Sequence, residues 1–339
     1  MKKYLPYIFL LLISSLLTSC FKEDERIMPY DRGDKLTAMI EMTQTYKYQV
    51  YFNLEDAQVV GVVNKQSFDL MFDTNPAGSH IFLNSANFMM AARTGKTSLS
   101  DVTSFAGLEM KFDPSTGNRD STAIGNWFSM NGNDTVFSGE VYVINRGYDD
   151  LGNTLGYRKM IFDSLKGQTY YFRYANLNGT NEVSARVTKS PEKNFSYYAF
   201  NSTEGQIYPE PDKNQYDLLF TQYTTLLFTN TGDPYPYLVT GVLLNRFNTF
   251  SALNQDLVFD SITRENAMEA NYINRLDVIG YDWKDVVGDV SSGIVFYEVK
   301  TENNYFIRTQ EGFYFKMRFV SFYNQSGEKG YPTIEFQRL

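Results

Sequence analysis

Few side chains in this 339-residue chain could ligate a metal or attack a substrate. It has one histidine, His80, and one cysteine, Cys20. These counts exclude a three-histidine zinc site, a bis-histidine haem site within one chain, and a disulfide framework. A serine–histidine–aspartate triad could use only His80, and no G-x-S-x-G sequence surrounds any serine. The 39 acidic residues leave a glycosidase-type carboxylate pair open, because spacing along the chain says little about spacing in the fold.

The composition indicates a folded, acidic protein. The formal net charge is -8, so we expect no basic surface of the kind that binds nucleic acid by counterion release. Hydrophobic residues make up 43% of the chain and aromatic residues 16%, which is inconsistent with a disordered polymer. Phenylalanine and tyrosine at this density are typical of thin β layers, where they fill inner faces and form cross-strand pairs.

The N-terminal segment predicts export and lipid attachment. Two lysines precede a short apolar stretch that ends in a small-residue site before Cys20, which is typical of a signal peptide rather than a membrane-spanning helix. The segment resembles a bacterial lipoprotein signal. That resemblance implies a signal peptide over 1–19, acyl chains on Cys20 and a tether over 20–34. The acidic residues after Cys20 resemble the export signal of Bacteroidetes surface lipoproteins, which implies an outward-facing position on the outer membrane. A plain secretory signal with an incidental cysteine is the alternative.

Short runs of alternating apolar and polar residues dominate the chain from about Thr37 onward. They are rich in β-branched and aromatic residues and are separated by turns of Asn, Asp and Gly, as expected for strands. Examples are the runs at 47–52, 139–144 and 169–174. Helical signals are confined to 266–273 and to a start at 98–102. The predicted class is mainly β, with few short helices.

An internal repeat predicts two modules. The segment 52–72 aligns without gaps on 200–220, and a second, gapped pair follows in the same order, which makes chance alignment improbable. We expect two tandem antiparallel β modules, 35–188 and 195–339, joined by a polar, Pro-containing linker. The matched positions include Phe52/Phe200, Asn53/Asn201, Gln58/Gln206, Lys65/Lys213, Asp69/Asp217, Leu70/Leu218 and Phe72/Phe220.

Three stretches of the second module carry a family resemblance. They are YDLLF at 216–220, GYDWK at 280–284, and the run 295–336, which holds an aromatic hairpin followed by GEKGYPTIEF. In this order they resemble the HmuY family of Bacteroidetes haem-binding lipoproteins. The first module keeps FDLMF at 68–72 and a later hairpin, and it matches more weakly. The resemblance implies a mostly β fold for both modules.

The same resemblance implies haem capture outside the cell and delivery to a TonB-dependent receptor. Family members hold the iron between two axial side chains, either His or Met, on facing segments. Here this implies His80 as one donor, since it follows the FDLMF strand closely, and Met89 or Met90 as the opposing donor. Met130 is a further candidate. Met89 and Met90 are adjacent, so on a strand only one could point into a haem slot.

Each candidate also has a purely structural reading. A histidine in a Pro/Gly turn is commonly a solvated loop residue, and methionine commonly fills gaps in a core. The second module has no histidine. Its Tyr235 and Tyr237, in a GDPYPY segment predicted to be a loop, could stack on a porphyrin or a sugar ring.

These observations lead to two expected functions. The first is a non-enzymatic outer-membrane surface lipoprotein that binds haem or a related tetrapyrrole, with no metal beyond the haem iron. The alternative has the same fold without the cofactor and uses its loops to contact a receptor, a glycan or a partner protein. A surface glycan-active enzyme is a third, weaker hypothesis.

Overall fold

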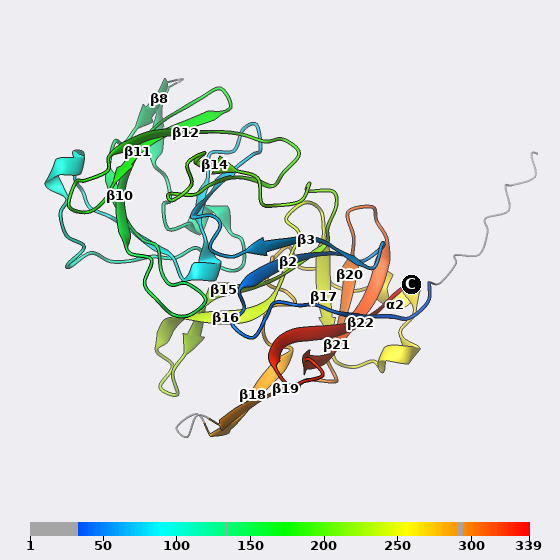
Figure 1. Cartoon of the computed structure of the whole chain (residues 1–339). Coiled ribbons are helices and arrows are strands. Elements are labelled where there is room, and N and C mark those ends of the chain that lie inside the picture. The colour runs from blue at the N-terminus through cyan, green and yellow to red at the C-terminus, as the bar shows by residue number, and fades with distance from the viewer. Residues whose placement is uncertain (1–32, 133, 290–293) are drawn as a thin grey trace, which may run out of the picture. The chain divides into compact units, whose positions relative to one another are not determined.

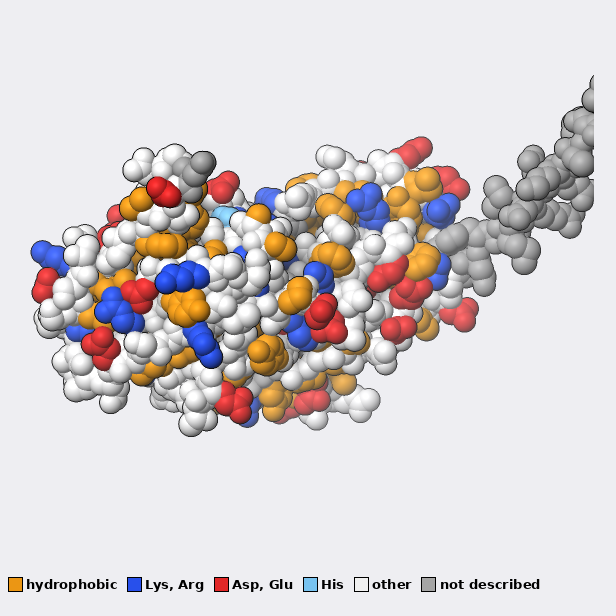
Figure 2. Space-filling model, turned by 90° about the horizontal axis from the view of Figure 1, so that it is seen from above, with side chains coloured by type: hydrophobic (Ala, Val, Ile, Leu, Met, Phe, Trp, Pro, Cys, Tyr) orange, Lys and Arg blue, Asp and Glu red, His pale blue; other side chains and the backbone are white. Residues whose placement is uncertain are grey.

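The computed structural model describes residues 33–132, 134–289 and 294–339. The predicted signal peptide, Cys20 and most of the predicted tether lie outside the described residues. Gly33–Leu339 forms one unit of short strands, and every strand pairing in it is antiparallel. The prediction of a mainly β chain is confirmed. Acidic, basic and apolar side chains are interspersed over the face seen in Figure 2.

Two five-stranded sheets have the same plan (Figure 1). The first contains, in spatial order, β12 (Val183–Thr188), β11 (Thr169–Ala175), β10 (Tyr157–Lys166), β9 (Val141–Asn145) and β6 (Met90–Arg93). The second contains β1 (Leu36–Met39), β22 (Lys329–Arg338), β21 (Tyr314–Tyr323), β20 (Asn304–Arg308) and β17 (Phe250–Asn254). Strand β22 shows the alternation that produces these strands, because Ile334 and Phe336 are buried while their neighbours Thr333 and Glu335 are partly exposed.

Two four-stranded sheets and two separate hairpins complete the strands. One sheet has the order β14 (Gln206–Ile207), β13 (Phe195–Tyr198), β4 (Leu70–Asp73) and β5 (Ile81–Leu83). The other has the order β16 (Pro234–Leu244), β15 (Leu218–Phe228), β2 (Tyr48–Asn53) and β3 (Gln58–Asn64). The hairpins are β7 (Phe128–Asn131) with β8 (Asp134–Phe137), and β18 (Lys284–Asp289) with β19 (Ile294–Val299).

Helical structure is short, as the sequence indicates. Helix α2 (Arg264–Met268) begins at a capping box, in which the Thr263 hydroxyl accepts from the Asn266 amide and the Asn266 side chain accepts from the Thr263 amide. Only the first part of the predicted segment 266–273 is therefore helical. The remaining helical elements are single 3-10 turns: η1 (Ser85–Asn87), η2 (Leu99–Asp101), η3 (Arg119–Ser121) and η4 (Phe259–Ser261).

The two halves of the chain exchange their first strands. β2 pairs with β15, with Phe52 opposite Leu218, and the blue β2 and β3 lie beside β15 and β16 in Figure 1. Reciprocally, β13 pairs with β4, with Tyr198 opposite Leu70. The edge strands differ in this respect. β1, from the first half, pairs with β22 of the second half, whereas β12 pairs with β11 of its own half. Each half therefore supplies strands that the other half's sheets need.

The two largest of the hydrophobic clusters in the described residues reflect this exchange. One core combines residues between Ile40 and Leu54 with residues between Leu218 and Phe336. The other draws all its members from the segment between Leu70 and Phe200. The predicted tandem copies, 35–188 and 195–339, are not confirmed as separate modules, because strand pairs cross the boundary between them.

A matched pair of aspartates fixes the exchange. The main-chain amide of Asp217 donates to the Phe52 carbonyl (2.9 Å), and its carboxylate accepts from the Leu54 amide (2.9 Å). In the mirrored position, the Asp69 amide donates to the Tyr198 carbonyl (2.9 Å), and its carboxylate accepts from the Phe200 amide (2.8 Å). These are the aspartates that the sequence repeat aligns, so each one ties its own copy to the other.

A matched pair of buried asparagines supports these aspartates. The main-chain amide of Asn84 donates to the Asp69 carbonyl, and that of Asn245 donates to the Asp217 carbonyl (3.0 and 2.8 Å). Each side-chain amide also donates to two carbonyls just before its aspartate: Asn84 to Lys65 and Phe68, and Asn245 to Lys213 and Tyr216. The two buried asparagine side chains thus make equivalent hydrogen bonds in both halves.

Candidate functional site

His80 lies in the turn between β4 and β5, where it contacts an aspartate. Its Nδ1 is 3.4 Å from the Asp73 carboxylate, and its carbonyl accepts from the Asp73 amide (3.0 Å). The side chain is about one third exposed. This arrangement orients the imidazole toward a carboxylate on its own hairpin, and a role as an iron ligand stays a prediction.

The three candidate methionines lie in different environments. Met89 is fully buried in the core that contains Phe72 and Trp127, so it fills that core. Met90 is half-buried on β6, and Met130 is largely exposed on the β7–β8 hairpin. Together with His80 they are spread over a turn, a core, a sheet and a hairpin. Met89 could reach a haem only if that core opened.

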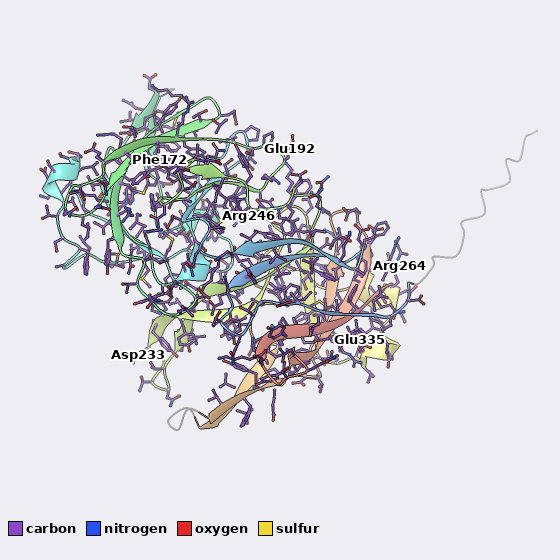
Figure 3. The ribbon with its side chains drawn as sticks, viewed as in Figure 1. Phe172, Glu192, Asp233, Arg246, Arg264 and Glu335 are labelled. Carbon is purple, nitrogen blue, oxygen red and sulfur yellow. The ribbon has the colours of Figure 1, made fainter. Side chains whose placement is uncertain are left out.

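Tyr235 and Tyr237 lie on a strand rather than on the predicted loop. They belong to β16, opposite Leu227 and Thr225 of β15, because the β15–β16 ladder extends as far as Pro234. Figure 3 labels Asp233 at the end of this hairpin. The two tyrosine rings are exposed and meet edge to face, 6.2 Å between centroids, since alternate strand residues share a face.

These two rings belong to a larger group of tyrosines, here called the tyrosine face. Its members are Tyr46, Tyr235, Tyr237, Tyr281, Tyr297 and Tyr323. The Tyr323 hydroxyl accepts from the Tyr297 amide (2.7 Å), which joins β21 to β19. Burial raises the pKa of Tyr46, Tyr281 and Tyr297, and neighbouring phenols add to the effect, so these hydroxyls are neutral at physiological pH.

A buried lysine lies under the tyrosine face. The Lys284 ammonium donates to the Thr240 carbonyl (2.6 Å) and lies over the rings of Trp283 (4.1 Å) and Phe322 (4.9 Å). Burial lowers the pKa of Lys284 to about 7. The ammonium of Lys329 lies over Tyr46 (5.5 Å), nearer the surface. The tyrosine face therefore combines exposed aromatic rings with cationic groups, an arrangement suited to a planar aromatic ligand that carries negative charge.

The space between the two four-stranded sheets is too small for such a ligand. A mainly apolar cavity of about 110 Å³ lies there, with Tyr51, Phe68, Tyr197 and Leu219 among its lining residues. Sites for drug-sized ligands have volumes of roughly 300–1,000 Å³. A tetrapyrrole is thus expected on the surface of this fold rather than between these sheets.

Metal and membrane features are limited in the described part of the chain. Over residues 33–132, 134–289 and 294–339, His, Cys, Asp and Glu side chains form no group of three or more that could hold a metal ion. Over the same residues, no helix has the length and apolar character needed to cross a bilayer.

The sheet plan defines a β-rich protein, and a family model identifies its relatives. The model described as HmuY protein matches residues 45–336. The chain belongs to the HmuY family. No curated protein matches it.

Solved structures of low sequence identity are also similar. One is the apo HmuY analog TFO of Tannerella forsythia, with 10% identity and a TM-score of 0.25, covering 91% of this chain and 97% of that one. Another is a Bacteroides vulgatus protein assigned as HmuY-like and heme binding, with 11% identity, a TM-score of 0.24 and coverage of 90% and 94%. A third, assigned as a lipoprotein of Bacteroides fragilis, has 16% identity, a TM-score of 0.19 and coverage of 53% and 88%.

Proposed function

We propose that this protein is a lipid-anchored carrier on the outer-membrane surface that binds haem or a related tetrapyrrole. Acylated Cys20 would hold it to the membrane, and a TonB-dependent receptor would accept the ligand. Membership of the HmuY family supports haem as the ligand, since the family includes haem-binding members. The observation that carries the site is the exposed pair Tyr235 and Tyr237 on β16. The protein would act by binding and release rather than by catalysis.

The residues of the tyrosine face fit a haem in three respects. The exposed rings of Tyr235 and Tyr237 offer a stacking surface, and a tyrosine phenolate is an established axial ligand for haem iron. The Lys329 ammonium beside Tyr46 offers a charge-assisted partner for a propionate. When bound, the porphyrin ring would supply the characteristic Soret absorption, and ligation of its iron would shift that band. The chain's own side chains would bind and orient the ring.

Haemin titration of the chain from residue 21 onward tests this proposal. We expect a shifted Soret band, and the double variant Y235A/Y237A should weaken haemin binding by about tenfold, because it removes the ring on which the porphyrin would stack and the ring packed edge-on against it. His80→Ala should leave the affinity unchanged. Tyr148→Ala is the matched control, since Tyr148 is an exposed tyrosine outside the tyrosine face. Loss of the band in His80→Ala, with the tyrosine variant unaffected, would assign the ligand to His80 instead.

A second candidate function is an interaction lipoprotein without a cofactor. The observation that favours it is the separation of the predicted donors, with His80 beside Asp73 and Met89 buried in a core. In this case loops or hairpins would contact a receptor, a glycan or a partner protein. An unchanged haemin spectrum with folded protein would favour this function over the carrier.

A further inference from the structure

A second binding feature has none of the six tyrosines in its wall. It is an open polar pocket of about 620 Å³, here called the basic pocket, formed by the segments 116–119, 245–250 and 274–276. Its wall contains three arginines, Arg119, Arg246 and Arg275, with four asparagines and two threonines, and no Asp or Glu lines it. Three cations without a lining carboxylate are unexpected in a chain of net charge -8. The volume is typical of a small-molecule site.

The three arginines differ in how their charge is balanced. Arg275 has an ion pair behind the wall with Asp277 (2.9 Å), and Arg119 has a longer one with Asp73 (3.6 Å). Within the residues that the structure describes, no carboxylate lies at ion-pair distance from Arg246. Asp73 and Asp113 act on Arg246 only at longer range, so the pocket contains a guanidinium without a direct ion-pair partner among the described residues.

Buried donors in the wall are also unsatisfied. Considering only the described residues, the Nε atoms of Arg119 and Arg246 and the hydroxyl of Thr249 are buried and have no hydrogen-bond partner. Thr249 is only 7% exposed, and it lines the basic pocket. Arg119 Nε faces Asp73 in the ion pair above, so the donors on Arg246 and Thr249 are the two that a ligand could satisfy. Leaving buried donors unpaired costs free energy, so these two groups in one pocket indicate a ligand that accepts hydrogen bonds.

The fold holds Arg246 in place before any ligand arrives. Its guanidinium lies over the rings of Phe82 (5.1 Å) and Phe195 (5.3 Å), and one terminal nitrogen donates to the Gly117 carbonyl (3.1 Å). Figure 3 shows Arg246 near the strands that the two halves exchange. Burial, and then the neighbouring Arg119, lowers the pKa of Arg246 to about 10, so it remains protonated at neutral pH.

Gly117 keeps the loop close to this guanidinium. Its φ is +77°, and a Cβ there would lie 2.5 Å from a Leu276 methyl carbon and 3.2 Å from an Arg246 nitrogen. Only glycine fits both this conformation and this approach. The segments 116–119 and 274–276 are joined by the Leu276 amide, which donates to the Thr116 carbonyl (3.1 Å). The pocket wall is thus a hydrogen-bonded assembly of three loops.

We propose that the basic pocket binds a small polyhydroxylated oxyanion, a sugar acid or a sugar phosphate, with the oxyanion on Arg246 and Thr249. A guanidinium pairs with carboxylate or phosphate through parallel charge-assisted hydrogen bonds. The side-chain amides of Asn248 and Asn274, both exposed at the wall, can donate and accept, as the hydroxyls of a sugar require. This site is additional to the proposed tetrapyrrole carrier and does not depend on it.

Calorimetric titration of the chain from residue 21 onward tests the ligand chemistry. The probes are glucuronate, glucose 6-phosphate, inorganic phosphate and glucose, each up to about 10 mM. We expect at least one of the two acidic sugars to bind, and to bind more tightly than phosphate, while glucose does not bind. Their ranking distinguishes a carboxylate from a phosphate ligand. Binding of glucose as tightly as the acids, or of phosphate as tightly as either acid, would overturn the proposal, as would no binding of either acid.

Three variants test the residues. Arg246→Met keeps the apolar stem against Phe82 and Phe195 and should weaken the acidic probes at least tenfold, by loss of the charge. Thr249→Val removes a hydroxyl without a partner in the described structure, so it should fold normally and weaken binding about threefold. Arg186→Met, an exposed arginine outside the pocket, is the control and should bind as wild type. Unchanged affinity in folded Thr249→Val and Arg246→Met would overturn the assignment. If Arg246→Met does not fold, Thr249→Val and the probe ranking still decide.

Discussion

Replacing Arg146 by methionine is expected to lower the free energy of unfolding at pH 7 by about 3–5 kcal/mol. Arg146 Nε donates to the Asp69 carboxylate at 2.7 Å, and both side chains are almost completely buried. The substitution leaves Asp69 as a buried charge without its partner. The same carboxylate accepts from the Phe200 amide of the other half, so the strand exchange loses support as well. Urea denaturation monitored by tryptophan fluorescence measures the change.

Two further variants separate the ion pair from lost packing. Asp69→Asn in the Arg146→Met background removes the unpaired charge while its amide oxygen can still accept from the Phe200 amide, so most of the lost stability should return. The exposed Arg186→Met should change the free energy of unfolding by no more than about 0.5 kcal/mol. A loss below about 1 kcal/mol in Arg146→Met would contradict a stabilising role for this pair.

The class of fold was readable from the sequence, but the strand partners were not. Alternation of apolar and polar residues predicts a strand and its buried face, and it indicates nothing about which distant strand lies beside it. The repeat aligned Asp69 with Asp217, and both occupy the mirrored positions that the alignment implies. The preceding strand, however, pairs with the opposite copy in each case. The repeat therefore identified equivalent residues correctly. Its simplest interpretation, two separate adjacent modules, is not confirmed.

The sequence repeat aligned the two buried aspartates but not the two buried asparagines that contact them, and the reason is the length of one hairpin. Asp69 and Asp217 are separated by 217 − 69 = 148 positions, whereas Asn84 and Asn245 are separated by 245 − 84 = 161. The difference of 161 − 148 = 13 arises because the β15–β16 hairpin is much longer than β4–β5. An ungapped comparison therefore cannot match the asparagines. The longer hairpin also explains why Tyr235 and Tyr237 lie on a strand, although the Gly and Pro residues of their segment predicted a loop.

The environments of the candidate iron ligands could not be predicted from the sequence either. His80 and Met89 have the right chemistry, but a sequence gives no sign that Asp73 contacts the imidazole or that Met89 completes a core. Arg246 was missed because a single arginine after a strand is an ordinary surface residue in sequence. Its interest comes from groups distant in the chain, namely the rings of Phe82 and Phe195 and the carbonyl of Gly117. The separation in sequence of these contacts is what made them unpredictable.

The second aspartate of the mirrored pair has no such cation. In the half that contains Asp217, Thr309 occupies the place that Arg146 occupies in the half that contains Asp69. The Arg146 amide donates to the Gly156 carbonyl just beyond the β9–β10 ladder, and the Thr309 amide donates to the Phe313 carbonyl just beyond the β20–β21 ladder. In the described part of the structure, Asp217 Oδ1 has no hydrogen-bond partner. Burial, with a smaller effect of Glu311, raises the pKa of Asp217 to about 7. A buried carboxylate without a cation should therefore be a source of instability.

Asp217→Asn is accordingly expected to raise the free energy of unfolding by about 4 kcal/mol at pH 8. In the wild type, the pKa of Asp217 is about 7 when folded and near 3.8 when unfolded. Between these values only the folded chain holds the proton, so this group's contribution to stability falls as pH rises from about 4 to about 7. The asparagine does not titrate, and its oxygen can still accept from the Leu54 amide. The gain should thus be largest above pH 7 and vanish near pH 4.

Denaturation of both proteins across pH 4–8 measures this difference directly, because every other titrating group is common to the two chains. Asp256→Asn makes the same chemical change at an exposed position and should change the free energy of unfolding by no more than about 0.5 kcal/mol. A gain that is equal at pH 4 and pH 8 would point to packing or to the unfolded state instead of charge burial. A loss at pH 8 would mean that the carboxylate stabilises the strand exchange even without a cation, and the contrast between the two mirrored aspartates would then have to be rejected.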